Sequence, residues 1–346
     1  MSYTIALNFE DDVTRFIHCD AGETVLDAAY RQKVNLPMDC SDGVCGTCKG
    51  LCEQGAFELG DDYLEEALSE EEAAEGRVLT CQMIPSSDCV IRVPGSSALC
   101  KTQMAQFDAV VGGVESLSDS TIELVVTLEE NAEPLTFLPG QYIKIGVPGT
   151  AESRSYSFSS RSGQQSASFL VRNIEGGLMS RYLTQACQAG QALTLTGPVG
   201  SFYLREIQRP VLFLAGGTGL APFLAMLATL AQTGCDYPLH MVYGVNRDSD
   251  LVKLDALDEY AARIDNFTYT TCVVDEASNH TRKGYVTHHL SDAVLNQGDL
   301  DVYLCGPPPM VEAVRAYFSE RGVTPAHVYY EKFTPSAAPG EEEDLA

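Results

Sequence analysis

Cysteines crowd one short stretch of the chain, CSDGVCGTC at residues 40–48, with glycine and serine between them. The spacing C-x4-C-x2-C, completed by a cysteine far downstream, is that of a plant-type [2Fe–2S] ligand set. The expected ligands are Cys40, Cys45, Cys48 and Cys81. Gly43 and Gly46 suit such a loop because glycine adopts positive φ freely, so backbone N–H groups can turn toward the negatively charged sulfur atoms. The spacing therefore predicts an iron–sulfur cluster.

Zinc and a redox-active thiol pair are the alternatives for this loop. Zinc prefers C-x2-C pairs or histidine ligands, and the nearest histidine in sequence is His18. A redox pair at Cys45 and Cys48 would require a helix N-terminus and no third cysteine just before it. Cys52 could replace Cys81, but a cysteine in a separate loop completes the pattern better. The remaining cysteines are expected to be small buried residues: Cys19, Cys89, Cys100, Cys187, Cys235, Cys272 and Cys305.

A second group of candidate residues surrounds a short strand in the middle of the chain. Arg154 and Tyr156 lie in the segment RSYS, which taken alone is typical of surface packing. The segment GGLMSRYL at 176–183 adds two glycines and Ser180 at a predicted helix start, which can present N–H groups and a hydroxyl to a phosphate. A cation, a flat ring and a helix start together fit a flavin dinucleotide.

A glycine turn follows a buried strand in VLFLAGGTGLAPFLAML, where a dinucleotide-binding turn would lie. Gly217, Thr218 and Gly219 can bring backbone amides to a pyrophosphate at the positive helix end. Pro222 replaces the third glycine of the usual motif and is tolerated in a first helical turn. A P-loop is excluded because no Gly-Lys-Ser/Thr is present, and a bare strand-to-helix turn is the alternative.

Two further loops are expected at the same sheet edge, because they too follow strands. CGPPPM, 305–310, places Cys305 where it could position a ligand or simply be a small residue in a crowded turn. The loop VNRDSD offers Arg247 beside Asp248 and Asp250. A carboxylate suits a free ribose hydroxyl, whereas a 2′-phosphate wants several cationic and hydroxyl partners, so this loop favours NADH over NADPH.

Three differently patterned segments must position these residues, and the length of 346 residues agrees with two or three domains. The first combines a hairpin at SYTIALNF and TRFIHC with a helix at TVLDAAYRQKV and a closing strand CVIRV. The second has six strand candidates with turn punctuation, which predicts a small antiparallel barrel. The third alternates strands and helices, which predicts a parallel sheet. The expected boundaries are 1–98, a linker at 99–106, 107–207, 208–335, and a disordered acidic tail at 336–346.

Charge and hydropathy narrow the possible partners. The net charge of −26 (22 basic against 48 acidic residues) argues against nucleic acid, because phosphate would be repelled. Residues 1–100 hold 19 acidic and 6 basic residues, a net of −13, so half of the excess falls on the cysteine-bearing segment. This acid serves either solubility or docking of a basic partner. With no apolar run of membrane-spanning length and no secretory signal, we expect a cytosolic protein and no membrane partner.

Taken together, the motifs R-x-Y-S, G-G-x-x-S, G-T-G-x-A-P and C-G-P-P resemble those of the ferredoxin–NADP reductase family. With the cysteine domain in front, residues 1–335 resemble the reductase component of a bacterial ring-hydroxylating dioxygenase. The resemblance implies a multidomain fold with a β-grasp-like α+β ferredoxin domain. An antiparallel six-stranded β-barrel would bind FAD, and an α/β domain with a parallel sheet would bind NADH.

Residue roles follow from the resemblance for the flavin and the nicotinamide. Arg154 would hold the FAD pyrophosphate, Tyr156 would stack on the isoalloxazine and Ser157 would approach its N5. Gly177, Met179 and Ser180 would line the phosphate side. The nicotinamide would lie against Cys305, Gly306, Pro307 and Met310. Phe333 in the closing segment EKF is the candidate to cover the flavin, with core packing as its alternative. Tyr156, Ser157 and Cys305 would then be the residues nearest to the hydride transfer.

The resulting hypothesis is electron transfer from NADH through FAD and the [2Fe–2S] cluster to a Rieske-type terminal oxygenase that docks near the ferredoxin domain. A flavin is needed between the two ends because NADH gives two electrons at once and the cluster accepts one at a time. The alternative enzyme is the reductase of a soluble di-iron monooxygenase. The alternative outside enzymes is a redox-sensing interaction protein that reads NADH levels.

Overall fold

The computed structural model describes residues 2–38, 43, 46–60, 63–65, 67–97, 105–129 and 131–333. The chain divides into two compact units, Met1–Ala105 with Val199–Ser201 and Gln106–Pro198 with Phe202–Ala346. Within the described ranges, no helix combines the length and the apolar character needed to cross a membrane.

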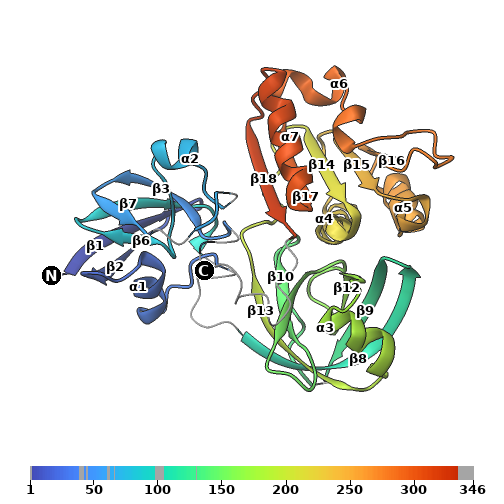
Figure 1. Cartoon of the computed structure of the whole chain (residues 1–346), viewed down its shortest axis with the longest axis horizontal. Helices are drawn as coiled ribbons and strands as arrows, with labels where there is room; N and C mark the ends of the chain where they lie inside the picture. The colour runs from blue at the N-terminus through green and yellow to red at the C-terminus, as the bar shows by residue number, and fades with distance from the viewer. Residues whose placement is uncertain are drawn as a thin grey trace. The chain divides into compact units, whose positions relative to one another are not determined.

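A five-stranded mixed sheet forms the first unit, in the order β2-β1-β7-β3-β5, with a small β4-β6 sheet beside it (Figure 1). The elements are β1 Ser2–Phe9, β2 Thr14–Asp20, α1 Val25–Arg31, β3 Lys49–Gln54, β4 Phe57–Leu59, α2 Glu70–Ala74, β5 Arg77–Leu79, β6 Met83–Pro85 and β7 Cys89–Val93. Strands β1 and β7 pair in parallel, whereas β1–β2, β3–β7 and β3–β5 pair antiparallel. The predicted hairpin and closing strand are thereby confirmed, as is the α+β class.

Helix α1 forms where the apolar spacing predicts it. The Thr24 hydroxyl caps the helix by accepting a hydrogen bond from the Asp27 N–H at 3.2 Å, which satisfies one otherwise unpaired amide. Val25, Ala28 and Ala29 are fully buried against the sheet. The Leu26 N–H donates to the Thr80 carbonyl at 2.9 Å, so the start of α1 is tied to the residue that precedes Cys81.

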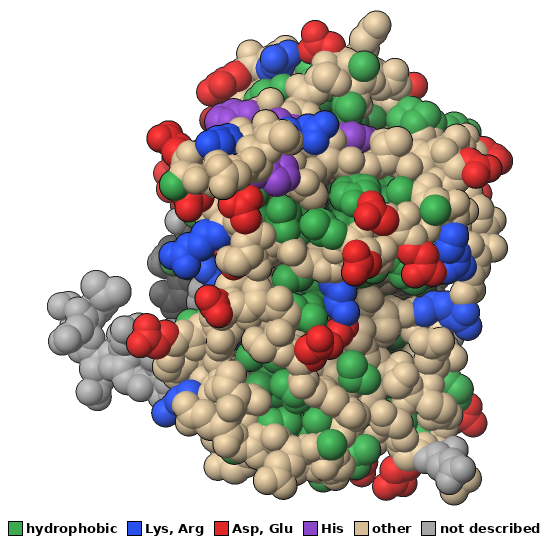
Figure 2. Space-filling view, turned by 90° about the vertical axis from the view of Figure 1, so that its right-hand side faces the viewer, with side chains coloured by type: hydrophobic (Ala, Val, Ile, Leu, Met, Phe, Trp, Pro, Cys, Tyr) green, Lys and Arg blue, Asp and Glu red, His purple; other side chains and the backbone are tan. Residues whose placement is uncertain are grey.

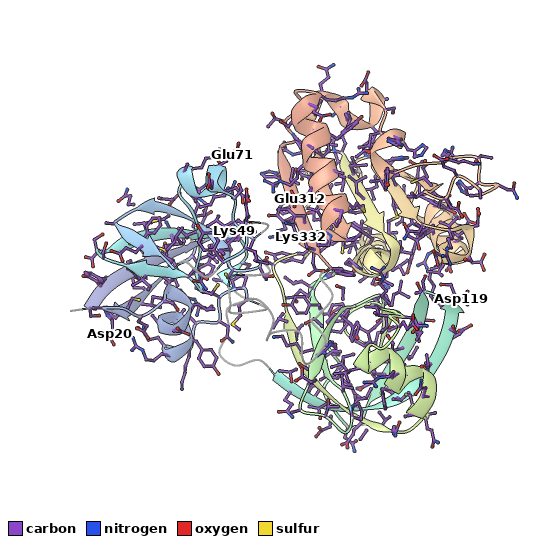
Figure 3. All side chains as sticks on the ribbon, in the orientation of Figure 1. Asp20, Lys49, Glu71, Asp119, Glu312 and Lys332 are labelled. Atoms are coloured by element: carbon purple, nitrogen blue, oxygen red, sulfur yellow. The ribbon has the colours of Figure 1, made fainter. Side chains whose placement is uncertain are left out.

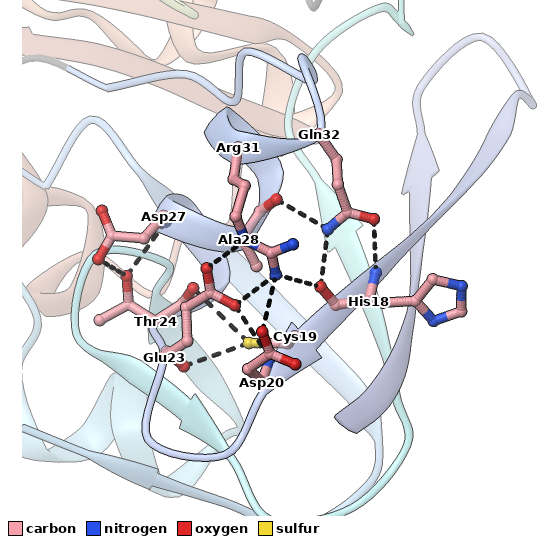
Figure 4. A network of polar contacts seen from close by, with 9 residues as sticks. All are labelled: His18, Cys19, Asp20, Glu23, Thr24, Asp27, Ala28, Arg31 and Gln32. Carbon is pink, nitrogen blue, oxygen red and sulfur yellow. Dashed lines mark hydrogen bonds and ion pairs between the residues drawn. The ribbon is translucent and has the colours of Figure 1, made fainter. Parts of the chain in front are cut away.

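A polar network fixes the end of α1 to β2 (Figure 4). The Arg31 guanidinium donates to both carboxylate oxygens of Glu23, at 2.9 and 2.7 Å, and to the His18 carbonyl at 3.0 Å. Gln32 bonds both backbone groups of His18. Cys19 lies fully buried beside this network, and burial raises the pKa of its thiol to about 12. It therefore packs as the small buried residue that was predicted.

An antiparallel six-stranded barrel begins the second unit and confirms the prediction (Figure 1). Its order is β11-β10-β13-β8-β9-β12, and a bridge between Phe158 and Phe169 joins its two ends. The elements are β8 Ala105–Ser118, β9 Thr121–Leu128, β10 Tyr142–Gly146, β11 Ser153–Ser157, β12 Ser166–Arg172, α3 Leu178–Arg181 and β13 Ala192–Val199. A wide helical turn, Tyr182–Ala186, continues α3. The barrel core is apolar and includes Leu124, Ile143 and Leu195.

A five-stranded parallel sheet completes the second unit, in the order β16-β15-β14-β17-β18, again as predicted. Its elements are β14 Val211–Gly216, α4 Ala221–Thr233, β15 Leu239–Val245, α5 Leu254–Arg263, β16 Phe267–Val273, α6 Asp292–Leu295, β17 Asp301–Gly306, α7 Pro308–Glu320 and β18 His327–Lys332. Strands β14 and β17 are buried along their whole length, so their carboxyl ends form the centre of the ligand-facing edge. The strand β18 was not predicted.

Figure 2 shows histidines gathered on one face of the molecule. Two histidines of the parallel-sheet region have hydroxyl partners on β16. A ring nitrogen of His240 lies 2.9 Å from the Thr268 hydroxyl, and one of His280 lies 3.0 Å from the Thr271 hydroxyl. These contacts give both residues structural roles in the sheet.

Candidate functional site

Two of the predicted cluster cysteines meet in the first unit. The Sγ atoms of Cys48 and Cys81 lie 3.3 Å apart, and both residues are buried. The separation is far longer than the ~2.05 Å of a disulfide. It is shorter than the ~4.6 Å limit for two sulfurs that each bind a common metal ion at ~2.3 Å. The other predicted ligands, Cys40 and Cys45, lie outside the described residues.

Strand pairing explains how cysteines far apart in sequence come together. In the antiparallel β3–β5 pair, Lys49 lies opposite Leu79. The Thr80 N–H donates to the Cys48 carbonyl at 3.2 Å, which fixes the turn that carries Cys81. Gly46 has a φ of +72°, and an added Cβ would lie 3.1 Å from the Ala67 carbonyl oxygen, which is closer than most Cβ contacts. Gly43 likewise has a φ of +79°. Both glycines therefore adopt the positive φ that the loop was predicted to need.

A buried ion pair follows Cys48 directly. Lys49 Nζ lies 2.6 Å from Glu72 Oε2, with the two side chains only 10% and 13% exposed. Glu72 also accepts from the Ser69 N–H, and the Ser69 hydroxyl accepts from the Glu72 N–H, so both residues form a capping box for α2. The pair holds α2 against the start of β3.

The other described cysteines do not join this pair. Cys52 donates its thiol hydrogen to the Gln54 carbonyl at 3.3 Å, and burial raises the pKa of its thiol to about 11. Cys19, Cys89, Cys272 and Cys305 are buried as expected. Cys187 and Cys235 are only half-buried, so the expectation of burial was wrong for them.

In the second unit, Arg154, Tyr156 and Ser157 lie on β11, at the end of the barrel order. The guanidinium of Arg154 bonds Glu152 Oε2 at 3.1 Å and the Ser153 carbonyl at 2.7 Å. Tyr156 packs partly buried against the barrel core, and burial raises the pKa of its hydroxyl. A cation and a flat ring two residues apart on one strand share a face, which fits a ligand with a phosphate and an aromatic ring.

Three side chains from three strands meet where the barrel contacts the parallel sheet. The Ser157 hydroxyl donates to Glu331 Oε2 at 3.0 Å. The Cys305 thiol donates to the same oxygen at 3.9 Å. Cys305 lies directly opposite Glu331 in the β17–β18 register. Glu331 thus links Ser157 of the barrel to Cys305 of the parallel sheet, two residues that the sequence singled out.

The electrostatics of this cluster keep Cys305 protonated. Burial first, and then the nearby Glu331 carboxylate, raise the pKa of the Cys305 thiol well above its ordinary value of 9.0. A neutral thiol is a poor nucleophile, so Cys305 can donate a hydrogen bond and fill space. Lys332 fixes the end of β18 by pairing with Glu312 of α7 at 2.8 Å, with its own side chain 6% exposed (Figure 3).

The glycine turn and the CGPPPM loop are packed tightly against each other. A Cβ on Gly219 would lie 2.3 Å from the Cys305 carbonyl oxygen, and one on Gly216 would lie 2.4 Å from Met310 Sδ. Thr218 between them is buried. Gly217 differs, because its φ is +55° and open space surrounds the place of its Cβ. The backbone at Gly217 is therefore accessible to a ligand at the sheet edge, as a dinucleotide turn requires.

Residues of the CGPPPM loop lie at the same edge. Gly306 ends β17 and could not carry a Cβ without approaching Met310 Sδ to 2.9 Å. Pro307 is the N-cap residue of α7. Phe333 packs partly buried against the core of the parallel sheet, and its N–H donates to the Gly306 carbonyl at 2.9 Å. Phe333 therefore makes the core contact that the sequence analysis gave as the alternative to covering the flavin.

The loop after β15 is anchored at both of its carboxylates. Asp250 accepts from the Ser120 hydroxyl of the barrel at 2.5 Å and from the Arg247 N–H at 3.2 Å. Asp248 accepts from the Ser278 hydroxyl at 2.8 Å and remains exposed. Asp250 therefore serves to hold the loop, which leaves Asp248 and Arg247 as its exposed charged groups.

The turn before α3 departs from what the sequence predicted. Ser180 was expected to present its hydroxyl to a phosphate, but this hydroxyl accepts from the Ile174 N–H at 2.9 Å and donates to the Arg172 carbonyl at 3.4 Å. Met179 and Ser180 are buried, and Gly177 is the N-cap of the four-residue α3. Gly177 is half-buried, and Gly176 before it is exposed.

Three family models match successive parts of the chain. A "2Fe-2S iron-sulfur cluster binding domain" matches residues 8–86, an "Oxidoreductase FAD-binding domain" matches 108–203, and an "Oxidoreductase NAD-binding domain" matches 213–316. The toluate 1,2-dioxygenase electron transfer component of Pseudomonas putida is 54% identical over 97% of this chain and 100% of that protein. The chain belongs to the family of dioxygenase electron transfer components.

Other comparisons agree with membership of this family. The 2-halobenzoate 1,2-dioxygenase electron transfer component of Burkholderia cepacia is 48% identical over 97% of this chain and 99% of that protein. The crystal structure of a cytochrome P450 reductase from Amycolatopsis has a TM-score of 0.71 and 31% identity, covering 96% of this chain and 100% of that one. The predicted resemblance to a ring-hydroxylating dioxygenase reductase is confirmed, and so are the three cofactors, [2Fe–2S], FAD and NADH.

Glu331, which contacts both Ser157 and Cys305, was not singled out by the sequence analysis. It lies in the segment EKF, of which only Phe333 was considered. A carboxylate directly before the predicted aromatic was the available signal, but its meaning depends on the register between β17 and β18.

Proposed function

We propose that this chain is the NADH-dependent reductase of a benzoate-class 1,2-dioxygenase, with benzoate itself as the substrate of its Rieske-type oxygenase. Two relatives of at least 48% identity serve dioxygenases named for toluate and 2-halobenzoate, which are both benzoates with one ring substituent. The ring and its carboxylate are the common features of these substrates. The chain itself would deliver electrons and not bind the aromatic compound.

The observation that supports the NADH-dependent reductase activity is the contact of Glu331 with two other residues. Its Oε2 atom lies 3.0 Å from the Ser157 hydroxyl and 3.9 Å from the Cys305 sulfur. A hydride donor and its acceptor must approach to roughly 3–3.5 Å, which requires that the two binding regions be held together. Because the Ser157 hydroxyl donates its hydrogen to Glu331, its oxygen would be left to accept a hydrogen bond on the flavin side. Glu331 orients Ser157 and Cys305 through one carboxylate oxygen, and the neutral Cys305 packs against the nicotinamide side.

We assign the flavin-binding roles to β11 and α3. Arg154 would bind the pyrophosphate, with Glu152 giving way to it, and Tyr156 would stack on the ring system. The backbone of Gly177 would face the phosphates, while Met179 and Ser180 shape the turn from within. When bound, the flavin supplies the conversion between two-electron and one-electron transfer that links NADH to the cluster.

The nucleotide roles fall to the ligand-facing edge of the parallel sheet. Gly217, Thr218 and Gly219 would bind the pyrophosphate, and Gly306, Pro307 and Met310 would line the nicotinamide side. Arg247 would contact the adenosine end. Asp248 would accept the ribose hydroxyl, which favours NADH because a 2′-phosphate would meet its negative charge.

The [2Fe–2S] cluster would be bound by Cys40, Cys45, Cys48 and Cys81. It would pass its electrons to the oxygenase. The 3.3 Å separation of two of these sulfurs and the positive φ of Gly43 and Gly46 support this set. The oxygenase would dock near the ferredoxin domain, where the net charge of −13 attracts a basic surface.

We propose the boundaries 1–98, 107–207 and 208–335 for the three domains, with a linker at 99–106 and an acidic tail at 336–346. We also propose a cytoplasmic location, where NADH is regenerated.

The proposed function is tested by reconstitution. The purified chain should contain one FAD and one [2Fe–2S] cluster, and it should support NADH-dependent turnover of a purified benzoate dioxygenase. A propane monooxygenase hydroxylase and its substrate serve as the control for the di-iron alternative. Faster support of the monooxygenase would overturn the choice of partner, and binding of NADH without reduction of any acceptor would favour the redox sensor.

A further inference from the structure

Arg205 lies in the segment that joins the barrel to the parallel sheet, and two tyrosine rings enclose its guanidinium. The guanidinium carbon lies 3.5 Å from the ring centre of Tyr203 and 4.6 Å from that of Tyr329 on β18. Arginine suits this position because its planar guanidinium stacks on aromatic faces, whereas the compact ammonium of lysine does not. Arg205 also donates to the Tyr203 carbonyl at 2.7 Å.

The backbone of the same segment connects the barrel to the sheet. The Leu204 N–H donates to the Pro139 carbonyl of the barrel at 2.8 Å. The next N–H, that of Arg205, donates to the Tyr303 hydroxyl of β17 at 3.0 Å. Two consecutive amides therefore bind the two halves of the unit. Gly140 shows how close the barrel side lies, since an added Cβ would be 2.8 Å from the Tyr203 Cα.

The contacts of Arg205 are connected to the Ser157–Glu331 contact in two ways, through the parallel sheet and through the barrel. Tyr303 and Tyr329 are register partners, and so are Cys305 and Glu331 two residues later. Because side chains alternate along a strand, both pairs lie on one face of the sheet. On the barrel side, the turn at Pro139 and Gly140 leads into β10, whose first residue Tyr142 pairs with Ser157.

On its other side the segment borders open space. Residues 204–207 line a cavity of about 390 Å³ together with Pro139 and the C-terminal part of α4. Leu204 and Ile207 pack against the apolar core of the parallel sheet, but the cavity leaves the segment less tightly packed on that side. The stacked arginine is therefore well placed to determine where the segment lies.

We propose that Arg205 is a positioning residue for hydride transfer, which holds β11 and β18 at the separation that brings nicotinamide and flavin together. The proposal rests on the proposed function, because it concerns the same hydride transfer. In this proposal Arg205 acts through Tyr203, Tyr329 and its own backbone. A displacement of about 1 Å at reacting atoms can reduce a rate about 100-fold, so a small shift of β18 suffices.

The first test uses the full chain without flavin. Hydrogen exchange followed by mass spectrometry reports on the peptides that contain 203–207 and 327–332. Arg205→Ala and Tyr329→Leu should both exchange faster in these peptides than the wild type. Arg209→Ala is the matched control, because this arginine of the same segment pairs with Asp299 and Asp301 and not with the tyrosines.

The second test is anaerobic single-turnover reduction of the bound flavin by NADH. Arg205→Ala and Tyr329→Leu should reduce the flavin 10 to 100 times more slowly, with NADH affinity within twofold of the wild type. The double variant should be no slower than the slower single variant, and Tyr329→Phe should retain more of the rate than Tyr329→Leu. Arg209→Ala should reduce flavin at the wild-type rate.

The outcomes separate the two proposals. If Arg205→Ala reduces flavin within twofold of the wild-type rate, or if Arg209→Ala loses as much rate, the positioning role is wrong. If the wild-type chain itself fails to reduce flavin with NADH, the proposed function is wrong instead. Should Arg205→Ala fail to fold, Tyr329→Leu and Tyr203→Leu decide the question by the same two measurements.

Discussion

The sulfur atoms of Cys48 and Cys81 lie 3.3 Å apart although 33 residues separate the two cysteines in sequence. The antiparallel β3–β5 pair brings them together, and the tie between Thr80 and Cys48 fixes the turn between them. We assign the cysteine pair to one-electron transfer and the Ser157–Glu331 contact to hydride transfer. Because the two lie in different units, mutations can test each step separately.

Replacing a cluster ligand should block only the outward half of the electron path. Cys45→Ser and Cys81→Ser are expected to abolish reduction of the oxygenase or an artificial one-electron acceptor, while flavin reduction by NADH keeps its rate. Loss of the visible cluster absorbance would accompany the change. Cys52→Ser is the control, because the Cys52 thiol bonds Gln54 and should be dispensable. Equal loss of flavin reduction in Cys81→Ser would contradict the assignment.

Removing the charge of Glu331 should slow hydride transfer. Glu331→Gln keeps the size of the side chain but weakens its hydrogen bonds to Ser157 and Cys305. We expect flavin reduction to fall about 10- to 100-fold in stopped-flow measurements, with little change in NADH affinity.

Because the raised pKa keeps the Cys305 thiol protonated, the wild-type rate should show no thiolate step as the pH rises from 7 to about 9. Rapid alkylation of Cys305 in this range would overturn the protonation state assigned to it.

The ion pair between Glu23 and Arg31 should make the first unit sensitive to acid (Figure 4). Hydrogen bonding to Arg31 lowers the pKa of Glu23 from its ordinary value of 4.5. A lowered folded-state pKa stabilises the fold above the unfolded value, and this stabilisation is lost as the pH falls through the folded value. Glu23→Gln should therefore lower the melting temperature by a few degrees at pH 7, and this difference should shrink below about pH 4.5. A difference independent of pH would contradict the ionic contribution.

Local patterns were sufficient to predict most of the fold. The apolar spacing of Val25, Ala28 and Ala29 predicted α1, and buried runs such as VLFLAGG predicted the parallel sheet, because these signals depend on neighbours in sequence. The strand β18 was missed because HVYYEK is only half-buried at most and lies at the edge of the sheet. Its identity as a strand comes from pairing with β17, which is a contact distant in sequence.

The same distinction applies to the site. The cysteine spacing alone predicts four cluster ligands, and two of these cysteines lie close together in the structure. Glu331 gains its meaning only from its register with Cys305, and the Ser180 hydroxyl is used within its own turn by Ile174. A sequence motif shows which groups are available, whereas the competition among hydrogen-bond partners is decided by the folded backbone.

Coenzyme preference should depend on Asp248 and not on Asp250. Asp248→Asn removes an exposed carboxylate that would repel a 2′-phosphate, so the ratio of kcat/KM for NADH over NADPH should fall about tenfold. Asp250→Asn weakens the anchor to Ser120 and Arg247, which should raise KM for both coenzymes alike. Steady-state kinetics with both coenzymes measure the two effects. A larger change of preference in Asp250→Asn would reverse the roles of the two carboxylates.

A methyl group at Gly219 should separate the two loops that face the nucleotide. The added Cβ would lie 2.3 Å from the carbonyl oxygen of Cys305, which is backbone and cannot rotate away, so the end of β17 must move. We expect Gly219→Ala to lose about 1–3 kcal/mol of stability through overpacking and to bind NADH more weakly, with flavin reduction at least tenfold slower. Gly234→Ala at the end of α4 is the control, because that position has a φ of +77° and open space. It should cost about 1–3 kcal/mol through backbone strain alone and leave NADH binding unchanged. If both variants bind NADH equally well by titration, the close packing of Gly219 on Cys305 does not shape the nucleotide site.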